Sequence, residues 1–396
     1  MKIVICGAGI AGLTLANQLA PNHDVTVVEK APGPRPQGYM IDFFGAGYDV
    51  AEKMDLLPSL KKVGYQVSEA AYLDETGRRR AGLPFDVFAK AVDAKLVSIM
   101  RPDLEAVLRS RLPASVDLRF GTSVRDIDAL PDNVAATLSD GSTIVADLLV
   151  GADGIHSAVR SLAFGTGDYL RYLGFHTAAY VFDDPSVHAQ VGDRFCLTDT
   201  VGKQFGFYAL RDGRVAAFTV HRTPDPTLPA DPRAAIRSVY ADLGWVVPQA
   251  LEACPDPADV YYDQVAQTVL PEWSRGRVVL IGDACHAVSL LAGQGASLGM
   301  AGAFVLAAHL DRTQSVREAL TGYEEIWRPV VEEKQQVARN GARWFLPASE
   351  SHLRIRRAAM RLARVPGFSR YLAGTIAGKT TAVIKQLQGR EHRPAS

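Results

Sequence analysis

Near the N-terminus, apolar and polar positions change their spacing twice within a short stretch. Residues 2–6, KIVIC, form an apolar run, which predicts a buried strand. The stretch that follows, to about Leu19, is predicted to be a helix, and residues 25–28 predict a second buried strand. This order of strand, helix and strand predicts the first β-α-β unit of a parallel sheet.

Alternating apolar and polar residues dominate the middle of the chain. Residues 170–268 contain HTAAYVF, RFCLTDTV, QFGFYAL and RVAAFTVHR, and Asp212-Gly213 separates the last two, which predicts an antiparallel hairpin. Residues 116–154 predict a β-meander with turns such as Asp140-Gly141. Residues 270–340 predict one more strand and two helices, the first of them about 15 apolar residues long.

These patterns together predict an α/β fold with a Rossmann-like nucleotide-binding domain, an antiparallel-sheet domain and C-terminal helices. The nucleotide-binding domain is discontinuous and is expected from residues 1–70, 96–165 and 270–340. The antiparallel sheet is expected from residues 71–95 and 170–268, where it covers a substrate. Residues 341–396 are expected to form the C-terminal helical segment.

Composition narrows the class of protein. The 396 residues carry a formal net charge of zero, which gives no general attraction to nucleic acid. No apolar run reaches the roughly 18 residues of a membrane span, and no signal peptide is recognisable. The four cysteines are scattered without a C-x-x-C pair, which disfavours a metal or disulfide framework and favours a cytoplasmic protein. The oligomeric state stays open.

The first turn carries a dinucleotide fingerprint. Gly7, Gly9 and Gly12 form G-x-G-x-x-G between the first strand and the helix. The glycines permit a tight turn, a close approach of the backbone to a pyrophosphate, and close packing of helix on strand, while the helix N-terminus faces the anion. Glu29 ends the second strand, where a carboxylate accepts ribose hydroxyls and disfavours a 2′-phosphate. FAD or NAD is therefore favoured over NADP, and the alternative is a glycine-rich turn without a ligand.

Two later segments make the signal specific. LLVGADGIHSAVR covers residues 148–160, and RVVLIGDACHAVSLLAGQGASLGMAGAFVLAAHL covers residues 277–310. With the fingerprint, they resemble the three ordered motifs of the flavoprotein aromatic hydroxylases, the single-component FAD monooxygenases that include p-hydroxybenzoate hydroxylase and the tetracycline-inactivating monooxygenases. The resemblance implies non-covalent FAD and NAD(P)H as a transient co-substrate.

The resemblance assigns roles to the later motifs. It implies that Asp153 and Gly154 contact FAD and NAD(P)H, and that Asp283 binds the ribityl hydroxyls of FAD. Arg160 is a candidate cation for a phosphate, with a surface charge as the alternative. His286 is expected to be a hydrogen-bonded structural histidine rather than an acid or base. Gly293 and Gly295 precede a helix whose N-terminus faces the pyrimidine edge of the flavin.

Two smaller pieces agree with this resemblance. IMRPDLEAVL places Arg101 before a helix, where the family's arginine contacts FAD phosphates or ribose, and the loop after Glu29 carries Arg35 and Gly38 beside the flavin. Arg35 is alternatively a surface residue. The expected cofactor-binding residues are Gly7, Gly9, Ala11, Gly12, Glu29, Lys30, Arg35, Gly38, Arg101, Val124, Asp153, Gly154, Asp283, Gly293, Gly295, Ala296 and Ser297.

The chain departs from the family pattern at three positions. Leu290 replaces a proline, Ser297 an asparagine, and Gly302 a common aspartate. These departures bear on flavin mobility and nicotinamide access rather than on FAD binding. A separate segment, GWVVP at residues 244–248, resembles part of a halogenase signature, but Val246 stands where the second tryptophan belongs. We interpret this segment as the end of a helix.

The remaining candidate residues each have two interpretations. Phe205, Phe207, Tyr208 and Phe218 line an aromatic substrate pocket on one sheet face, or are simply core. Residues 352–393 hold ten Lys/Arg and one acid, which suits a membrane-surface helix or, more often, a packed helix with a solvated face. By resemblance, a C-terminal helix can lie beside the substrate pocket. The basic positions at helical spacing are Arg354, Arg357, Arg361 and Arg364.

The resulting hypothesis is an NAD(P)H- and FAD-dependent monooxygenase. NAD(P)H reduces FAD, O2 adds to give a C4a-hydroperoxide, and one oxygen atom passes to an aromatic or polyketide-like small molecule. A single fingerprint and the lack of a C-x-x-C pair disfavour a glutathione-reductase type of enzyme. No catalytic side chain is assigned, because the flavin supplies the chemistry. The alternatives are an FAD-dependent reductase of an unsaturated, isoprenoid-like substrate and a non-enzymatic FAD-binding module.

Overall fold

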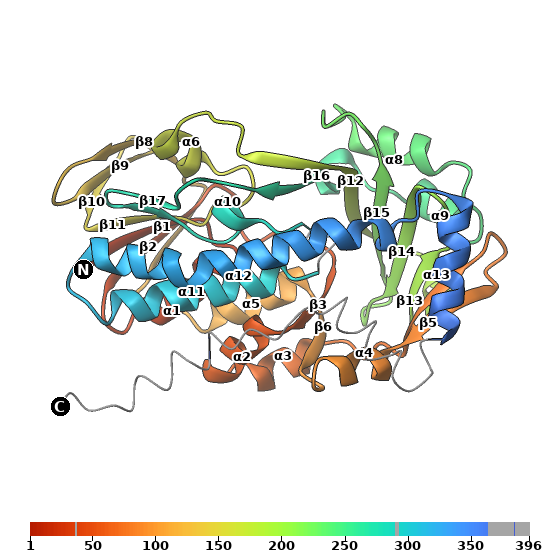
Figure 1. Cartoon of the computed structure of the whole chain (residues 1–396). Helices are drawn as coiled ribbons and strands as arrows, with labels where there is room; N and C mark the ends of the chain where they lie inside the picture. The colour runs from red at the N-terminus through yellow and green to blue at the C-terminus, as the bar shows by residue number, and fades with distance from the viewer. Residues whose placement is uncertain (36–37, 290–292, 363–383, 385–396) are drawn as a thin grey trace.

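The computed structural model describes residues 1–35, 38–289, 293–362 and 384. It is built around two large sheets at opposite ends of the molecule (Figure 1). The first has six strands in the order β17-β18-β11-β1-β2-β7, parallel except for the edge strand β17. Its strands are β1 (Lys2–Cys6), β2 (Asp24–Glu29), β7 (Asp117–Phe120), β11 (Leu148–Gly151), β17 (Ser274–Arg275) and β18 (Val278–Leu280).

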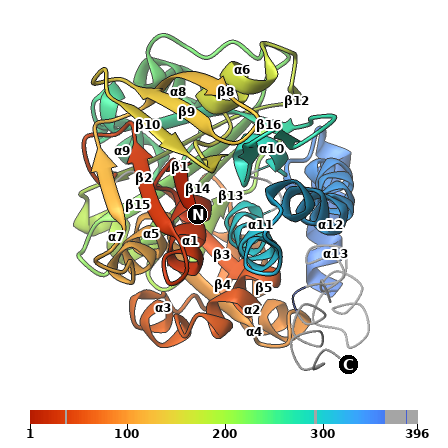
Figure 2. The same ribbon diagram turned by 90° about the vertical axis from the view of Figure 1, so that its left-hand side faces the viewer.

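Helices cover one side of this sheet, and a small sheet lies on the other. Figure 2 shows α11 and α12 side by side on one side of β1 and β2, and β8, β9 and β10 on the opposite side. All β1 side chains except Lys2 are buried, which agrees with the expected buried strand. The first side holds α1 (Ile10–Leu19), α11 (Gly295–Leu310) and α12 (Val316–Phe345). The other side holds β8 (Val124–Ala129), β9 (Val134–Leu138), β10 (Thr143–Ala146) and the short helix α6 (Ala158–Phe164), which contacts β8.

The expected β-meander was partly wrong. Strands β8, β9 and β10 form the antiparallel meander, but β7 pairs in parallel with β2 of the six-stranded sheet. The local pattern cannot show this, because an alternating strand fits either partner and only the tertiary pairing decides.

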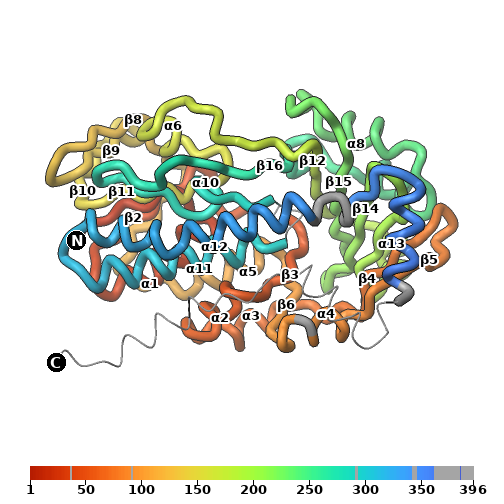
Figure 3. The backbone as a smooth tube through the Cα atoms, in the orientation of Figure 1, coloured from red at the N-terminus to blue at the C-terminus, as the bar shows by residue number. Residues whose placement is uncertain are grey.

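The second sheet has seven strands in the order β16-β12-β15-β14-β13-β4-β5. Two of its strands come from residues 69–84 and the other five from residues 170–268. Figure 3 shows the chain passing between the two sheets along β12, β16 and α12. The strands are β4 (Glu69–Leu73), β5 (Arg79–Pro84), β12 (Leu170–Phe182), β13 (Phe195–Thr198), β14 (Lys203–Ala209), β15 (Val215–Arg222) and β16 (Tyr261–Thr268).

The two faces of this sheet have different partners. Phe205 and Phe207 are fully buried in an apolar cluster with side chains of α7, α8 and α9 on the outer face. Tyr208 and Phe218 lie on the inner face, since Phe218 pairs with Gly206 across the strands and side chains alternate between faces. The four residues therefore form no single pocket: Phe205 and Phe207 belong to the core, as the alternative allowed, whereas Tyr208 and Phe218 line the inner cavity. The outer helices are α7 (Pro185–Val191), α8 (Pro232–Tyr240) and α9 (Val247–Glu252).

A two-stranded antiparallel sheet connects the two large sheets. Strands β3 (Met40–Phe44) and β6 (Leu96–Met100) pair so that Asp42 lies opposite Ser98. Figure 1 shows these strands with the neighbouring helices along the lower side of the molecule. Those helices are α2 (Ala46–Lys53), α3 (Leu57–Val63), α4 (Phe85–Ala91) and α5 (Arg101–Ser110).

The C-terminal helix α13 (Glu350–Leu362) packs against β5 and not simply by an apolar face. Arg354 is exposed, but Arg356 is buried and Arg357 half-buried, and both pair with Asp199. The expected solvated basic face therefore holds only in part, because a buried acid on the sheet attracts two of the arginines. Arg364 and the side chain of Arg361 lie outside the described residues.

The segment GWVVP was expected to end a helix, but it contains the start of one. Helix α8 ends at Tyr240, Trp245 has φ of 57°, and α9 begins at Val247. Within the described ranges, no helix is both long and apolar enough to cross a membrane.

Candidate cofactor and substrate site

The glycine fingerprint folds into a tight strand-to-helix turn. Gly7 has φ of +112°, and a Cβ atom on Gly12 would lie only 2.0 Å from the Gly7 carbonyl oxygen. This contact lets α1 pack closely on β1. No side chain caps the helix at Gly9, so its first amides remain available as hydrogen-bond donors for an anion.

Glu29 is held at the end of β2 by backbone donors. Its carboxylate accepts hydrogen bonds from the amides of Ala8 and Ala31, both at 2.9 Å. Arg35 pairs with it at 3.3 Å but is half-exposed, as the surface alternative also allowed. The carboxylate is thus placed beside the fingerprint turn by local contacts, in the position expected for a ribose-binding acid.

Two connected hollows meet at this turn. The nucleotide groove, about 480 Å³, runs from Glu29 and Val124 past Gly9 to Asp283. The inner cavity, about 360 Å³, continues from Asp283 to the space between the β3–β6 pair and the seven-stranded sheet. The residues that line both are Gly9, Tyr39, Arg101, Ala152, Gly154, Ile155, Tyr261, Asp263 and Asp283.

Most of the predicted cofactor residues line these hollows, but Gly12 and Ser297 do not. Gly12 packs against the turn, which is the role expected of the third glycine. The residues lining the nucleotide groove are Gly7, Gly9, Glu29, Lys30, Arg35, Gly38, Arg101, Val124, Asp153, Gly154 and Asp283. Those lining the inner cavity include Gly9, Ala11, Arg101, Gly154, Asp283, Gly293, Gly295 and Ala296.

Asp283 lies where the two hollows join, at the start of α10 (Asp283–His286). Its side chain is exposed to the hollow although the residue lies deep inside the protein. Burial raises the pKa of this carboxyl group, and the positive charge of Arg101 opposes that rise. Arg101 itself pairs with Glu105 at 2.9 Å. A carboxylate that faces a hollow is suited to accept hydrogen bonds from ligand hydroxyls.

The side chains of Asp153 and Arg160 form hydrogen bonds within the protein, mainly to its backbone. The Asp153 carboxylate accepts from the Ser157 hydroxyl at 2.5 Å and from the Ala158 amide at 2.7 Å, so it caps α6. The buried Arg160 guanidinium donates to the carbonyl oxygens of Ala284 at 2.8 Å and Ile155 at 2.7 Å. The interpretation of Arg160 as a phosphate cation was therefore wrong, because backbone acceptors hold it.

His286 has the structural role that was expected. It is 2% exposed, and its Nε2 accepts a hydrogen bond from the Gly282 amide at 3.2 Å. Burial lowers the pKa of this imidazole to about 4, so it is neutral at physiological pH. Its ring contacts Trp273 with centroids 5.3 Å apart.

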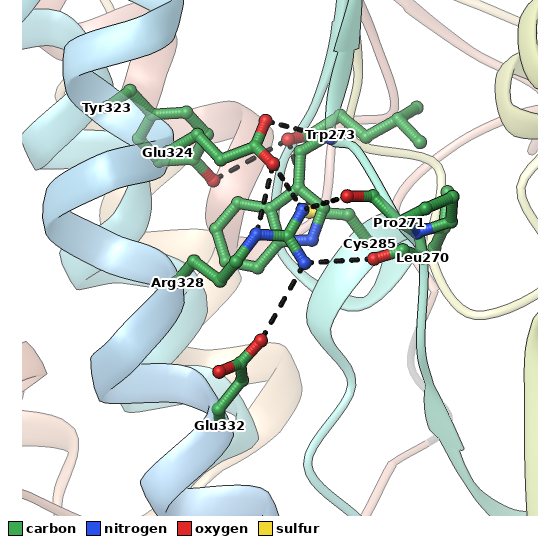
Figure 4. Close-up of polar contacts among 9 residues, drawn as sticks. Leu270, Pro271, Trp273, Cys285, Tyr323, Glu324, Arg328 and Glu332 are labelled. Carbon is green, nitrogen blue, oxygen red and sulfur yellow. Dashed lines mark hydrogen bonds and ion pairs between the residues drawn. The ribbon is translucent and has the colours of Figure 1, made fainter.

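Helix α12 supports the segment that presents Asp283. Figure 4 shows Arg328 of α12 directed at the segment between β16 and β17. It donates to the Leu270 carbonyl at 2.9 Å, forms an ion pair with Glu324, and lies 4.7 Å from the centroid of the Trp273 ring. Glu324 in turn accepts from the Trp273 amide at 2.9 Å. The Trp273 carbonyl accepts a hydrogen bond from the amide of Leu280 in β18, the strand that precedes Asp283.

Two of the three departures from the family pattern lie in the described residues, and neighbouring side chains and backbone explain them. The Ser297 hydroxyl bonds the Phe44 carbonyl and the Gly47 amide, so it joins α11 to α2 and points away from the cavity. At Gly302, a Cβ atom would lie 2.6 Å from the Trp327 indole nitrogen, so a larger residue is excluded by that ring. Leu290 lies outside the described residues.

Several site residues had no clear sequence signal. Tyr39 and Tyr261 line both hollows, with ring centroids 5.8 Å apart. The only sequence feature that could have indicated Tyr39 is its position directly after Gly38 in the predicted flavin loop, and no sequence feature indicated Tyr261.

His156, inside the second motif, forms a hydrogen bond with Asp263 at 2.9 Å, and this hydrogen bond raises the pKa of the imidazole.

The inner cavity is aromatic away from Asp283. Tyr208 stacks on Phe195 with centroids 4.0 Å apart, and Phe88 meets Phe44 edge-on at 5.5 Å. Phe218 lies nearer to Tyr39, at 6.1 Å. All of these rings line the cavity. Such walls suit a flat, apolar ligand.

Comparisons with known proteins agree with this geometry. The model of a family described as "FAD binding domain" matches residues 1–338. An uncharacterized protein of Mycobacterium tuberculosis is 32% identical over 321 residues, which cover 78% of this chain and 84% of that protein. A flavin-dependent monooxygenase of an unknown prokaryotic organism is 30% identical over 346 residues, covering 84% and 87%. The crystal structure of tetracycline destructase Tet(55) has a TM-score of 0.80 at 26% identity and covers 96% of this chain and 98% of its own.

Proposed function

This chain belongs to the FAD binding domain family and is an FAD-dependent monooxygenase, and from this premise we propose what it oxidises and how. It takes electrons from NAD(P)H, uses O2, and adds one oxygen atom to an aromatic or polyketide-like small molecule. The observation that supports this substrate class is the aromatic inner cavity, which continues directly from the predicted flavin site at Asp283.

The residues present fit FAD along the whole nucleotide groove. The adenosine end of FAD lies between Glu29 and Val124, and the Glu29 carboxylate accepts hydrogen bonds from the ribose hydroxyls. The pyrophosphate lies at the uncapped N-terminus of α1, near Gly9 and Arg101. The exposed carboxylate of Asp283 accepts from the ribityl hydroxyls. A chain with these groups needs no covalent bond to hold FAD.

The flavin ring is proposed to lie at the entrance to the inner cavity. Gly293, Gly295 and Ala296 line this part of the cavity, and α11 begins at Gly295. The helix N-terminus stabilises negative charge there by about 0.3–1 kcal/mol. When bound, FAD supplies the hydride acceptance and oxygen activation that the protein's side chains cannot.

The side chains of the inner cavity then position the substrate. Phe195, Tyr208 and Phe218 offer flat apolar walls and exclude water from the reacting ring. Tetracycline destructase Tet(55) is named for a multi-ring substrate, which supports a polyketide-like ring system as one class to test. The four cysteines are buried free thiols, which supports the proposal that the protein works in the cytoplasm.

The test is oxygen-18 incorporation. Purified protein with FAD is incubated under ¹⁸O2 with NADH or NADPH and a panel of phenols, quinones and tetracyclines, and products are weighed by mass spectrometry. We expect one substrate class to gain one ¹⁸O atom and to stimulate NAD(P)H oxidation. The Asp283→Ala variant, with its flavin site impaired, is the matched negative control. A product that gains two hydrogens and no label would make the protein a reductase instead.

A further inference from the structure

One carboxylate lies in the aromatic part of the inner cavity, away from the flavin site. Asp42 is in the middle of β3, directly opposite Ser98 of β6. Because side chains alternate along a strand, Asp42 shares its face with Met40 and Phe44, and all three line the cavity. The fold therefore places one acid among aromatic and apolar side chains.

The protein's own donors use only part of the hydrogen-bonding capacity of the Asp42 carboxylate. The Ser98 hydroxyl donates to one Asp42 carboxylate oxygen at 2.5 Å. Among the described residues, no Lys, Arg or His forms an ion pair with Asp42. A carboxylate offers about four acceptor sites, so most of its capacity faces the cavity. Burial raises the pKa of this carboxyl group, and the Ser98 hydrogen bond opposes that rise.

The neighbouring side chains define the shape of the ligand. Phe88 lies edge-on to Phe44, and Phe195 stacks on Tyr208. Burial raises the pKa of the Tyr208 hydroxyl, and the nearby charge of Asp42 adds to that rise. A planar ring fits between such walls. The remaining acceptor sites of Asp42 open onto the cavity, so a ring that brings an O–H or N–H group to them forms a hydrogen bond that a ring without a donor lacks.

We propose that Asp42 is a specificity-determining residue that accepts a hydrogen bond from a ring hydroxyl or ring N–H of the substrate. The same carboxylate repels rings that carry a carboxylate of their own. The preferred substrate class is therefore a neutral hydroxylated or amino-substituted aromatic compound rather than an aromatic acid. This inference rests on the proposed function, because it assigns the inner cavity to the substrate.

The test is equilibrium binding to the FAD-loaded protein without NAD(P)H, using 2-naphthol, 2-methoxynaphthalene and 2-naphthoate as probes. These share one ring system and differ in offering a donor, no donor or an anion. We expect the wild-type protein to bind 2-naphthol at least tenfold more tightly than the other two. Equal affinities, or no binding of 2-naphthol, would overturn the proposal. This comparison does not depend on any variant folding.

The Asp42→Asn variant tests the residue itself. Because the asparagine amide oxygen is a neutral and weaker acceptor, we expect this variant to lose part of the preference for 2-naphthol over 2-methoxynaphthalene. Because the negative charge is gone, we expect it to bind 2-naphthoate at least tenfold more tightly than wild type does. The control is Asp86→Asn on α4, an exposed acid outside the cavity, which should leave all three affinities unchanged. FAD content and thermal stability of both variants are measured alongside. An Asp42→Asn protein that keeps the wild-type ranking would overturn the assignment.

The two proposals fail in different ways. Binding needs no turnover, so a kept preference for 2-naphthol with no ¹⁸O product would leave Asp42 as a recognition residue and remove the oxygenation proposal. Conversely, ¹⁸O incorporation into aromatic acids as readily as into phenols would keep the proposed function and overturn the role of Asp42.

Discussion

Arg356 of α13 donates to the carboxylate of Asp199 at 2.9 Å, and both side chains are almost fully buried. Arg357 reaches the other carboxylate oxygen at 2.5 Å, and the Arg356 guanidinium lies 4.4 Å from the centroid of the Tyr72 ring. Asp199 directly follows β13, so these contacts join the C-terminal helix to the seven-stranded sheet. The two segments are far apart in sequence and are held by charge as well as by apolar packing.

Replacing Arg356 by methionine should destabilise the protein by about 3 kcal/mol. The substitution keeps an apolar stem but leaves Asp199 as a buried charge with one arginine fewer, and breaking a buried pair from one side is costly. The measurement is urea unfolding. Arg354→Met is the control, because Arg354 is exposed on the same helix and its loss should change stability by less than about 0.5 kcal/mol. Equal effects of the two substitutions would contradict a role for the buried pair.

Replacing Asp283 by alanine should weaken FAD binding roughly 10- to 100-fold. The variant loses a carboxylate that faces the hollow, and hydrogen bonds to a charged group contribute about 1.5–3 kcal/mol. The measurement is titration of apoprotein with FAD, followed by quenching of flavin fluorescence. Asp128→Ala, an exposed acid on β8, should bind FAD as wild type does. Unchanged affinity in the Asp283 variant would place the ribityl chain elsewhere.

Alanine substitutions of two phenylalanines on neighbouring strands should have different effects, one on substrate binding and the other on stability. Phe218→Ala should raise KM for the aromatic substrate, with little loss of stability, because its ring lines the inner cavity. Phe207→Ala should lower stability by about 3–5 kcal/mol, because its ring is fully buried in the outer apolar cluster. Thermal unfolding and steady-state kinetics separate the two. A stable Phe207 variant with raised KM would show that the faces are assigned the wrong way round.

The His156–Asp263 pair should stabilise the protein more at low pH than at high pH. The hydrogen bond to Asp263 raises the pKa of His156 above its unfolded value of about 6.5, so the contribution is complete below that value. It is lost as pH rises through the raised folded-state pKa. Because His156 is half-exposed, the effect should be below about 1 kcal/mol.

The matching experiment compares wild type with His156→Asn across this range. The difference in unfolding free energy between the two proteins should be larger at pH 5.5 than at pH 9. His352, an exposed histidine on α13, offers a second histidine variant as a control for general pH effects. A difference that grows with pH would contradict the raised pKa.

Sequence reasoning succeeded where function depends on contacts close along the chain. The fingerprint turn needs Gly7 and Gly12 five residues apart, and Glu29 is held by the amides of Ala8 and Ala31. Strand, turn and helix follow one another there, so the spacing of residues already encodes the geometry. The ordered motifs then added FAD and the monooxygenase family, which the comparisons confirm.

The sequence also indicated which residues were apolar but not which way they faced. The register between β14 and β15 sends Phe207 to the outer core and Phe218 to the cavity. Arg160 looked like a phosphate ligand because its helix follows a nucleotide motif, yet the Ala284 carbonyl, far along the chain, takes its guanidinium. Such partners cannot be found from local spacing.

By itself, therefore, the sequence determined the nucleotide turn, the flavin family and the alternation of buried positions. Only the tertiary structure decided where the proposed substrate cavity lies. Asp42 and Ser98 meet because β3 and β6 pair antiparallel, and Asp42 lines the same cavity as aromatic side chains of the seven-stranded sheet. Pairing between distant strands depends on the summed burial of many side chains, whereas a glycine turn depends on a few adjacent backbone angles.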